Sequence, residues 1–112
     1  MRTTSQRFTQ LRRGLLELAV LELIASNTRS FYGKEILQRL TETEFAVPKG
    51  TLYPLLSKMR HEKILVSYYE EDDFGGRKYY YLTIRGKKLL RELEAYWKLL
   101  NDSLEKLRAE TQ

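Results

Sequence analysis

The stretch that decides the fold is PKGTLYPLLSKMRH, residues 48–61. Its large apolar side chains recur at i, i+3, i+4 and i+7, the spacing of a helix with one buried face. They are Leu52, Leu55, Leu56 and Met59. Pro48 is expected to open this helix, because an N–H group has no partner in the first turn. Pro54 would remove an interior hydrogen bond, so the helix either begins near Thr51 or bends over its first turn.

The remaining face of this helix is polar and slim. It carries Lys49, Thr51, Tyr53, Ser57 and Lys58. A helix that enters the major groove of DNA needs such a face, because its side chains must reach the edges of the base pairs. Any one exposed lysine on an amphipathic helix is as readily explained as a solvated residue. The face therefore predicts DNA contact only together with what flanks it.

Two helices are expected before this one. The apolar pattern favours a helix over about 8–26 and a shorter one over 31–43, with a break at 27–30 and Ser30 as the second N-cap. Residues 44–47 form the turn into the third helix. The apolar surface of the first helix is broad and comprises Phe8, Leu11, Leu15, Leu16, Leu18, Val20, Leu23 and Ile24. Its width indicates contact with more than one neighbour.

A hairpin is predicted after the third helix. Residues 65–70 and 77–82 are rich in β-branched and aromatic side chains, and Asp72-Asp73-Phe74-Gly75-Gly76 between them is a turn. Two short helices joined by a tight turn and followed at once by a hairpin define a winged helix-turn-helix. The predicted fold class is therefore mainly α (α+β), with a two-stranded wing and a long C-terminal helix.

Positive charge accompanies these elements. The net charge is +5, and all of it falls in residues 1–64, because the charges of residues 65–112 balance. The candidates to neutralise phosphates beside the third helix are Arg12, Arg13, Lys34, Arg60 and Lys63. Arg77 and Lys78 follow two glycines in the wing, where they are placed to reach a flanking minor groove. Together these features predict a sequence-specific DNA-binding protein.

The C-terminal segment predicts a dimerisation helix. Thr83 is its expected cap, and six large apolar residues follow at spacings of 3, 4, 3, 4 and 3, an a/d seam. They are Leu90, Leu93, Trp97, Leu100, Leu104 and Leu107. A lone helix exposing this seam would aggregate, so we expect it to dock on Leu11, Leu15 and Leu18 of a partner subunit.

The expected domain organisation is a DNA-binding unit, residues 1–82, and a dimerisation helix, residues 83–112, in one compact whole. A two-fold dimer would place two third helices roughly 34 Å apart, which matches an inverted-repeat operator on double-stranded DNA.

Other classes of protein are disfavoured by composition. The chain has no cysteine and one histidine, His61, and it lacks a Gly-rich phosphate loop, so we expect no catalytic residue, no metal site and no cofactor. Adjacent carboxylates such as Asp72 and Asp73 are usually solvated turn residues. No apolar run approaches the roughly 20 residues of a membrane span. The N-terminus has no apolar secretion signal, which favours the cytoplasm.

The sequence resembles the PadR-type transcriptional regulators over nearly its whole length. The matching segments are Leu15–Leu21, Tyr32–Ile36, Gly50–Leu56, Arg77–Tyr80, Leu82–Thr83 and Gly86, and GTLYPLL at Gly50–Leu56 is the most specific. The resemblance implies a winged-helix dimeric repressor of the short subfamily, and it makes Pro54 part of the usual third helix. In some short members a flat aromatic effector lies between the subunits against a tryptophan. That position here is Trp97, with Leu93 beside it, although Trp97 is explained equally well as a filler of the dimer core.

Three positions depart from the family pattern. Lys49 stands where an acid is usual, and Tyr81 stands where a basic residue is frequent. Lys63 replaces the glycine that commonly ends the third helix, and holding a lysine in the left-handed region would cost roughly 1 kcal/mol. We therefore expect that this helix ends differently here.

The main alternative is a winged-helix module that binds another protein and no specific DNA. The acidic run Glu70-Glu71-Asp72-Asp73 favours it, because these side chains would repel a phosphate backbone. Salt separates the two, since DNA binding weakens steeply with salt and an apolar protein contact does not.

Overall fold

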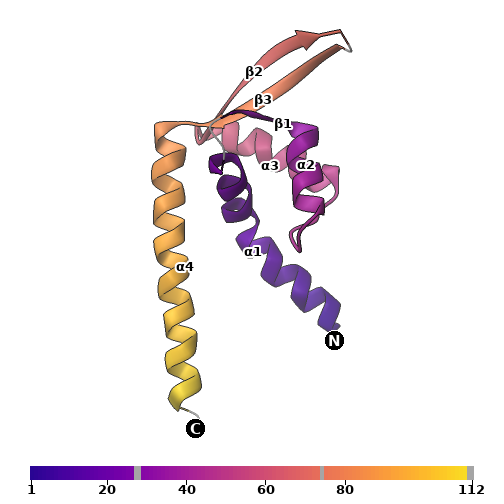
Figure 1. Cartoon of the computed structure of the whole chain (residues 1–112). Coiled ribbons are helices and arrows are strands. Elements are labelled where there is room, and N and C mark those ends of the chain that lie inside the picture. The colour runs from indigo at the N-terminus through magenta and orange to yellow at the C-terminus, as the bar shows by residue number, and fades with distance from the viewer. Residues whose placement is uncertain (27–28, 74, 111–112) are drawn as a thin grey trace.

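The computed structural model describes residues 1–26, 29–73 and 75–110 and has a winged helix-turn-helix fold, as predicted (Figure 1). The elements follow in the order α1 (Thr4–Ala25), β1 (Phe31–Tyr32), α2 (Gly33–Thr41), α3 (Lys49–His61), β2 (Leu65–Asp72), β3 (Gly75–Leu82) and α4 (Ile84–Glu110). Asn27 and Thr28 of the predicted break and Phe74 of the predicted turn lie outside the described residues. The wing and α4 leave the body of the molecule in different directions.

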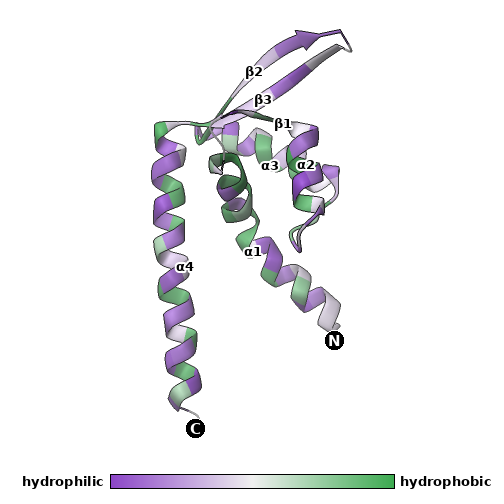
Figure 2. Cartoon of the chain, viewed as in Figure 1, coloured by the Kyte–Doolittle hydropathy of each residue, from purple (hydrophilic) through white to green (hydrophobic). Residues whose placement is uncertain are grey.

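The core lies where α1, α2 and α3 meet the base of the sheet. Its fully buried side chains include Val20 and Leu21 of α1, Ile36 of α2, Leu52, Leu56 and Met59 of α3, and Phe31 and Leu65 of the strands. Figure 2 shows the hydrophobic residues of α1 concentrated in its C-terminal half, next to α3 and the sheet. Of the four apolar residues predicted to be buried in α3, Leu55 is only half-buried.

The first helix begins earlier than the apolar pattern indicated. It begins at Thr4, four residues before Phe8, because Thr3 caps it and the Thr3 hydroxyl accepts the Gln6 N–H at 3.1 Å. The Gln6 side chain in turn accepts the Thr3 N–H at 2.8 Å, which completes a capping box. Hydrogen bonds of exposed polar residues therefore set the start of α1.

The second helix begins later than predicted. Ser30 is not its N-cap; Tyr32 occupies that position without a side-chain cap. Phe31 and Tyr32, expected to be helical, form β1 and pair antiparallel with Tyr80 and Tyr79. The sheet therefore has three strands in the order β1-β3-β2, one more than the predicted wing.

The strands of the wing are longer than predicted. The register runs from Leu65 opposite Leu82 to Asp72 opposite Gly75, so Asp72, Gly75 and Gly76 belong to strands rather than to the turn. Gly75 has a φ of 105°, a conformation that favours glycine. Backbone pairing thus continues almost to the end of the wing.

The end of α3 differs from our expectation, because Lys63 adopts the left-handed conformation with φ 62°. The N–H groups of Lys63 and Ile64 bond to the carbonyls of Arg60 and Met59, each at 3.0 Å, in a Schellman ending. The burial of Ile64 and Met59 that accompanies this ending offsets the strain at Lys63.

The joint between α3 and α4 is made by Thr83, which caps α4 as predicted. Its hydroxyl oxygen accepts a hydrogen bond from the Gly86 N–H at 2.9 Å. The same hydroxyl donates a hydrogen bond to the Lys63 carbonyl oxygen at 2.7 Å. The Thr83 N–H donates to the Ile64 carbonyl oxygen at 3.1 Å. The residues that end α3 therefore hold the start of α4 directly.

Candidate nucleic-acid interface

The outer face of α3 is exposed along its whole length. The residues predicted to face DNA there, Lys49, Thr51, Tyr53, Ser57 and Lys58, are all exposed. A step of about 100° per residue places Gly50, Pro54, Ser57 and His61 at the centre of this face, with Tyr53 and Lys58 on its flanks. Sequence reasoning did not include Gly50, Pro54 and His61 among the DNA contacts, although the same angular count places them at the centre of the face. Pro54 lies inside the helix with its ring on the exposed side.

A first hollow, of about 320 Å³, lies at the N-terminal end of α3. Arg12 and Arg13 of α1 line it together with Thr51 and the turn that precedes α3. The unpaired N–H groups of a helix N-terminus and two guanidinium groups both attract a phosphate. The structure thus brings three of the predicted site residues together at a place suited to an anion.

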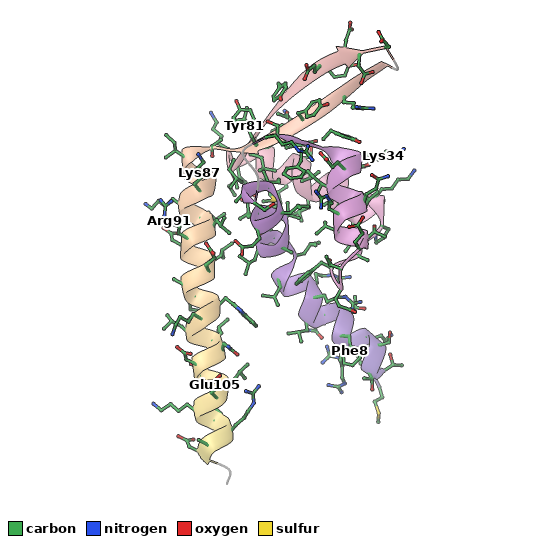
Figure 3. All side chains as sticks on the ribbon, viewed as in Figure 1. Phe8, Lys34, Tyr81, Lys87, Arg91 and Glu105 are labelled. Atoms are coloured by element: carbon green, nitrogen blue, oxygen red, sulfur yellow. The ribbon has the colours of Figure 1, made fainter. Side chains whose placement is uncertain are left out.

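A second hollow, of about 380 Å³, lies between α3, the start of α2 and the wing. Lys34, Tyr53, Arg77 and Lys78 all line it. The ring of Tyr53 packs against Gly33, where an added Cβ would lie 3.3 Å from Cε1. Figure 3 places Lys34 on α2 below the wing, on the side of the molecule away from α4. Four predicted contacts from three elements therefore border one groove.

The two predicted wing cations have different surroundings. Arg77 lies 3.5 Å from a carboxylate oxygen of Asp72, and its guanidinium carbon is 4.8 Å from the centre of the Tyr32 ring. A hydrogen bond with Tyr79 and the charge of Asp72 raise the pKa of Arg77 above its ordinary value. Lys78 makes no ion pair within the described residues. Successive side chains leave a strand on opposite faces, so the two cations border the second hollow from opposite faces of β3.

An ion pair secures the start of α2. The Arg29 guanidinium donates to both carboxylate oxygens of Glu35, at 3.0 and 2.5 Å. This hydrogen bonding lowers the pKa of the Glu35 carboxyl from its ordinary value of 4.5. Arg29 also stacks on the ring of Phe31, with its guanidinium carbon 4.7 Å from the ring centre. The pair supports the helix that carries Lys34.

The predicted dimerisation residues fall into three groups. Leu11, Trp97, Leu100, Leu104 and Leu107 are exposed, with exposed fractions from 40% for Trp97 to 68% for Leu11. Leu15, Leu18 and Leu93 are half-buried against the core of their own chain. Leu90 is buried at 7% exposure within the same chain, so it belongs to the protomer's own core and not to an exposed seam. Phe8, Tyr96 and Leu99 are further exposed apolar residues that the seam did not include.

An apolar hollow of about 400 Å³ lies beside Trp97, between α1, α2 and α4. Apolar side chains form most of its wall, among them Leu15 and Leu18 of α1 and Phe45 of the turn that follows α2. Glu22 also lines it, and burial, followed by the nearby Glu94, raises the pKa of the Glu22 carboxyl. Leu93 is not among the described residues that line this hollow.

Two other kinds of site are absent from the described part of the chain. Within residues 1–26, 29–73 and 75–110, no group of three or more His, Cys, Asp or Glu residues is close enough to hold a metal ion. In the same part of the chain, no helix combines the length and the hydropathy that a membrane crossing requires.

Comparison with known proteins identifies the relatives of this chain. The transcriptional regulator PadR-like family matches residues 20–92. An uncharacterized protein of Lysinibacillus sphaericus is 36% identical over 89 residues, covering 76% of this chain and 80% of that protein. A PadR-like transcription factor from Bacteroides fragilis is 38% identical with a TM-score of 0.75, covering 88% of this chain and 95% of that one. A PadR family transcriptional regulator from Eggerthella lenta is 33% identical with a TM-score of 0.84, and the match covers 92% of this chain and 89% of that one.

Proposed function

The chain belongs to the PadR-like family of transcriptional regulators, and from that premise we propose that it is a repressor that binds an inverted-repeat operator as a homodimer. The observation that carries the proposal is the groove between α3 and the wing. It is lined by Lys34 and Lys78 as well as by Tyr53 of α3, so one protomer offers polar groups for base edges and cations for the adjoining phosphates. On this proposal the protein acts in the cytoplasm, where its DNA is, and is not an enzyme.

Within each half-site we assign base contacts to the exposed face of α3. Lys49, Thr51, Tyr53, Ser57 and Lys58 are exposed on that face, and their side chains have hydrogen-bonding groups. Arg12, Arg13 and Lys34 would neutralise phosphates on either side of it, and Lys78 of the wing would do so at the flank. Because the family usually has an acid at the position of Lys49, we expect an operator that differs at the bases near the start of α3.

The proposed dimer uses the exposed apolar surface of α4. Trp97, Leu100, Leu104 and Leu107 are its exposed members. Hydrophobic residues continue along α4 past the part of the helix that lies beside α1 (Figure 2). Leu11 and the half-buried Leu15 and Leu18 of a partner's α1 would cover it. Covering large exposed side chains stabilises association, at about 25 cal/mol for each Å² of apolar surface removed from water.

We further propose that a small aromatic effector binds in the apolar hollow beside Trp97 and releases the operator. The hollow is of the size and apolar character typical of small-molecule sites. It adjoins α1 and α4, both elements of the proposed dimer, so an occupant would alter how the subunits pack. Trp97 as a simple filler of the dimer core remains the competing explanation.

The test is selection of bound duplexes from a random DNA pool, followed by affinity measurements over a range of salt concentrations. We expect enrichment of an inverted repeat with half-sites about one helical turn apart. Lys58→Gln should weaken binding severalfold, whereas the matched change Lys88→Gln on α4, where Lys88 pairs with Glu92 at 4.0 Å, should not. No enrichment, with weak binding lost at physiological salt, would leave the protein-binding module as the function.

A further inference from the structure

The outer half of the wing lacks the support that the inner half has. β2 and β3 pair with each other over their full length, but β1 pairs only with Tyr79 and Tyr80 of β3. Residues 69–72 and 75–78 therefore project beyond the third strand as a two-stranded ribbon (Figure 1). Such a ribbon is only marginally stable by itself, so side chains must fix the angle at which it leaves the body.

Arg77 connects this ribbon to the body. It bonds to Asp72 near the end of β2 and stacks on Tyr32, which is both the last residue of β1 and the N-cap of α2. The Tyr32 ring meets the Tyr79 ring edge-on at 5.7 Å, and Tyr79 stacks on Tyr68 at 5.4 Å with an interplanar angle of 12°. A continuous set of contacts therefore runs from the wing to the start of α2.

The same contacts make Arg77 a poor phosphate ligand. Its charge is already compensated by Asp72, whose carboxylate would repel a phosphate at the same place. Its guanidinium would have to leave the Tyr32 ring to reach DNA, at the loss of a cation–π contact. Lys78, the next residue, has neither restraint, and it lines the same groove as Arg77, Lys34 and Tyr53.

We propose that Arg77 is a positioning residue of the wing. It holds the wing against Tyr32 so that Lys78 is presented to the DNA backbone, and it makes no phosphate contact itself. The proposal rests on the operator-binding function proposed above and adds to it a division of labour between two adjacent cations. It assigns to Tyr32 a role in DNA affinity without a contact to DNA.

The salt dependence of operator binding distinguishes the two roles. Fluorescence anisotropy titrations would follow the selected duplex over a salt series for Arg77→Gln, Lys78→Gln and Tyr32→Leu. Log K falls with log salt, and loss of a phosphate contact makes this negative slope smaller in magnitude by about one, so Lys78→Gln should show that change. Arg77→Gln should lower affinity about threefold to tenfold with an unchanged slope.

Two further variants test whether Arg77 acts through Tyr32. Tyr32→Leu should weaken binding as Arg77→Gln does, and the double variant should be no weaker than either one, because both changes break one contact. Tyr32→Phe keeps the ring and should bind like the unchanged protein. A slope reduced in magnitude by about one in Arg77→Gln, or fully additive losses in the double variant, would make Arg77 a direct phosphate ligand and overturn the proposal.

Hydrogen exchange without DNA separates this proposal from the operator function. Arg77→Gln and Tyr32→Leu should speed the exchange of backbone amides at 69–72 and 75–78 relative to Lys78→Gln, because the ribbon opens more readily. Faster exchange in a protein that selects no DNA sequence would refute the operator and leave the positioning role standing. Equal exchange rates in all three variants would refute the positioning role whatever DNA the protein binds.

Discussion

Gly86→Ala places a methyl group where the start of α4 lies against the backbone of Ile64. A Cβ at Gly86 would lie 2.2 Å from the Ile64 carbonyl oxygen, whereas ordinary contact begins at 3.4 Å. The start of α4 must therefore move by about 1 Å in a close-packed region. The obstacle is backbone, and that backbone also accepts the Thr83 N–H at 3.1 Å, so the movement strains the cap of α4.

The expected cost of Gly86→Ala combines three effects. Overpacking costs about 1–3 kcal/mol, and weakening the Thr83 cap costs about 1 kcal/mol. Alanine returns at most about 1 kcal/mol through its higher helix propensity. We therefore expect a net loss of about 1–3 kcal/mol in the free energy of unfolding, which lowers Tm by roughly 5–15 °C.

Thermal unfolding followed by circular dichroism, at one fixed protein concentration, measures this loss. Gly50→Ala is the matched control, because nothing lies within 4 Å of a Cβ at exposed Gly50 of α3. It should leave Tm unchanged or raise it slightly. If Gly86→Ala unfolds at or above the temperature of Gly50→Ala, the close approach does not constrain α4, and the reasoning is refuted.

Three further predictions concern the residues that hold the helices. Lys63→Gly should stabilise the protein by about 1 kcal/mol in urea unfolding, because glycine adopts a φ of 62° without strain, and Lys63→Ala should give no such gain. Thr83→Val should lower the free energy of unfolding by about 1–2 kcal/mol in the same assay through loss of the cap. Thr83→Ser keeps the hydroxyl and should retain most of the stability that the cap provides. The lowered pKa of Glu35 implies that its pairing with Arg29 stabilises the fold fully above the unfolded value of 4.5 and is lost as pH falls through the folded value. The stability difference between the unchanged protein and Glu35→Gln should therefore shrink as the pH of the unfolding experiment is lowered below 4.5, and a difference independent of pH would contradict this.

The elements recoverable from the sequence are those with local signals. The apolar period at Leu52, Leu56 and Met59 predicts α3 because the same residues that define the helix also bury it. Thr83 predicts the start of α4 because an N-cap acts within its own turn. These signals need no knowledge of distant parts of the chain. The order of such elements was sufficient to predict the winged helix-turn-helix fold.

The features that the sequence could not predict depend on distant partners. The sequence predicts helix at Phe31 and Tyr32. They form a strand because they pair with Tyr80 and Tyr79, which lie far along the chain. The heptad spacing includes Leu90 but cannot tell whether its partner lies in the same chain or in another. The role proposed for Arg77 could not be predicted from the sequence for the same reason. It depends on contact with the ring of Tyr32, which lies far from Arg77 along the chain.

The joint between α3 and α4 links the two halves of the proposed function. The carbonyl oxygens of Lys63 and Ile64, directly after α3, both lie within hydrogen-bonding distance of Thr83, directly before α4. Gly86 lets α4 approach this same backbone without a side chain between them. In the proposed dimer, α4 fixes the partner and α3 reads the operator, so the stiffness of this joint sets the distance between the two half-site helices. A change of subunit packing at the hollow beside Trp97 would therefore reach α3 through α4 and its joint rather than through the wing. For this reason we expect a destabilised joint, as in Gly86→Ala, to lower discrimination between operators of different half-site spacing even at temperatures where the protein remains folded.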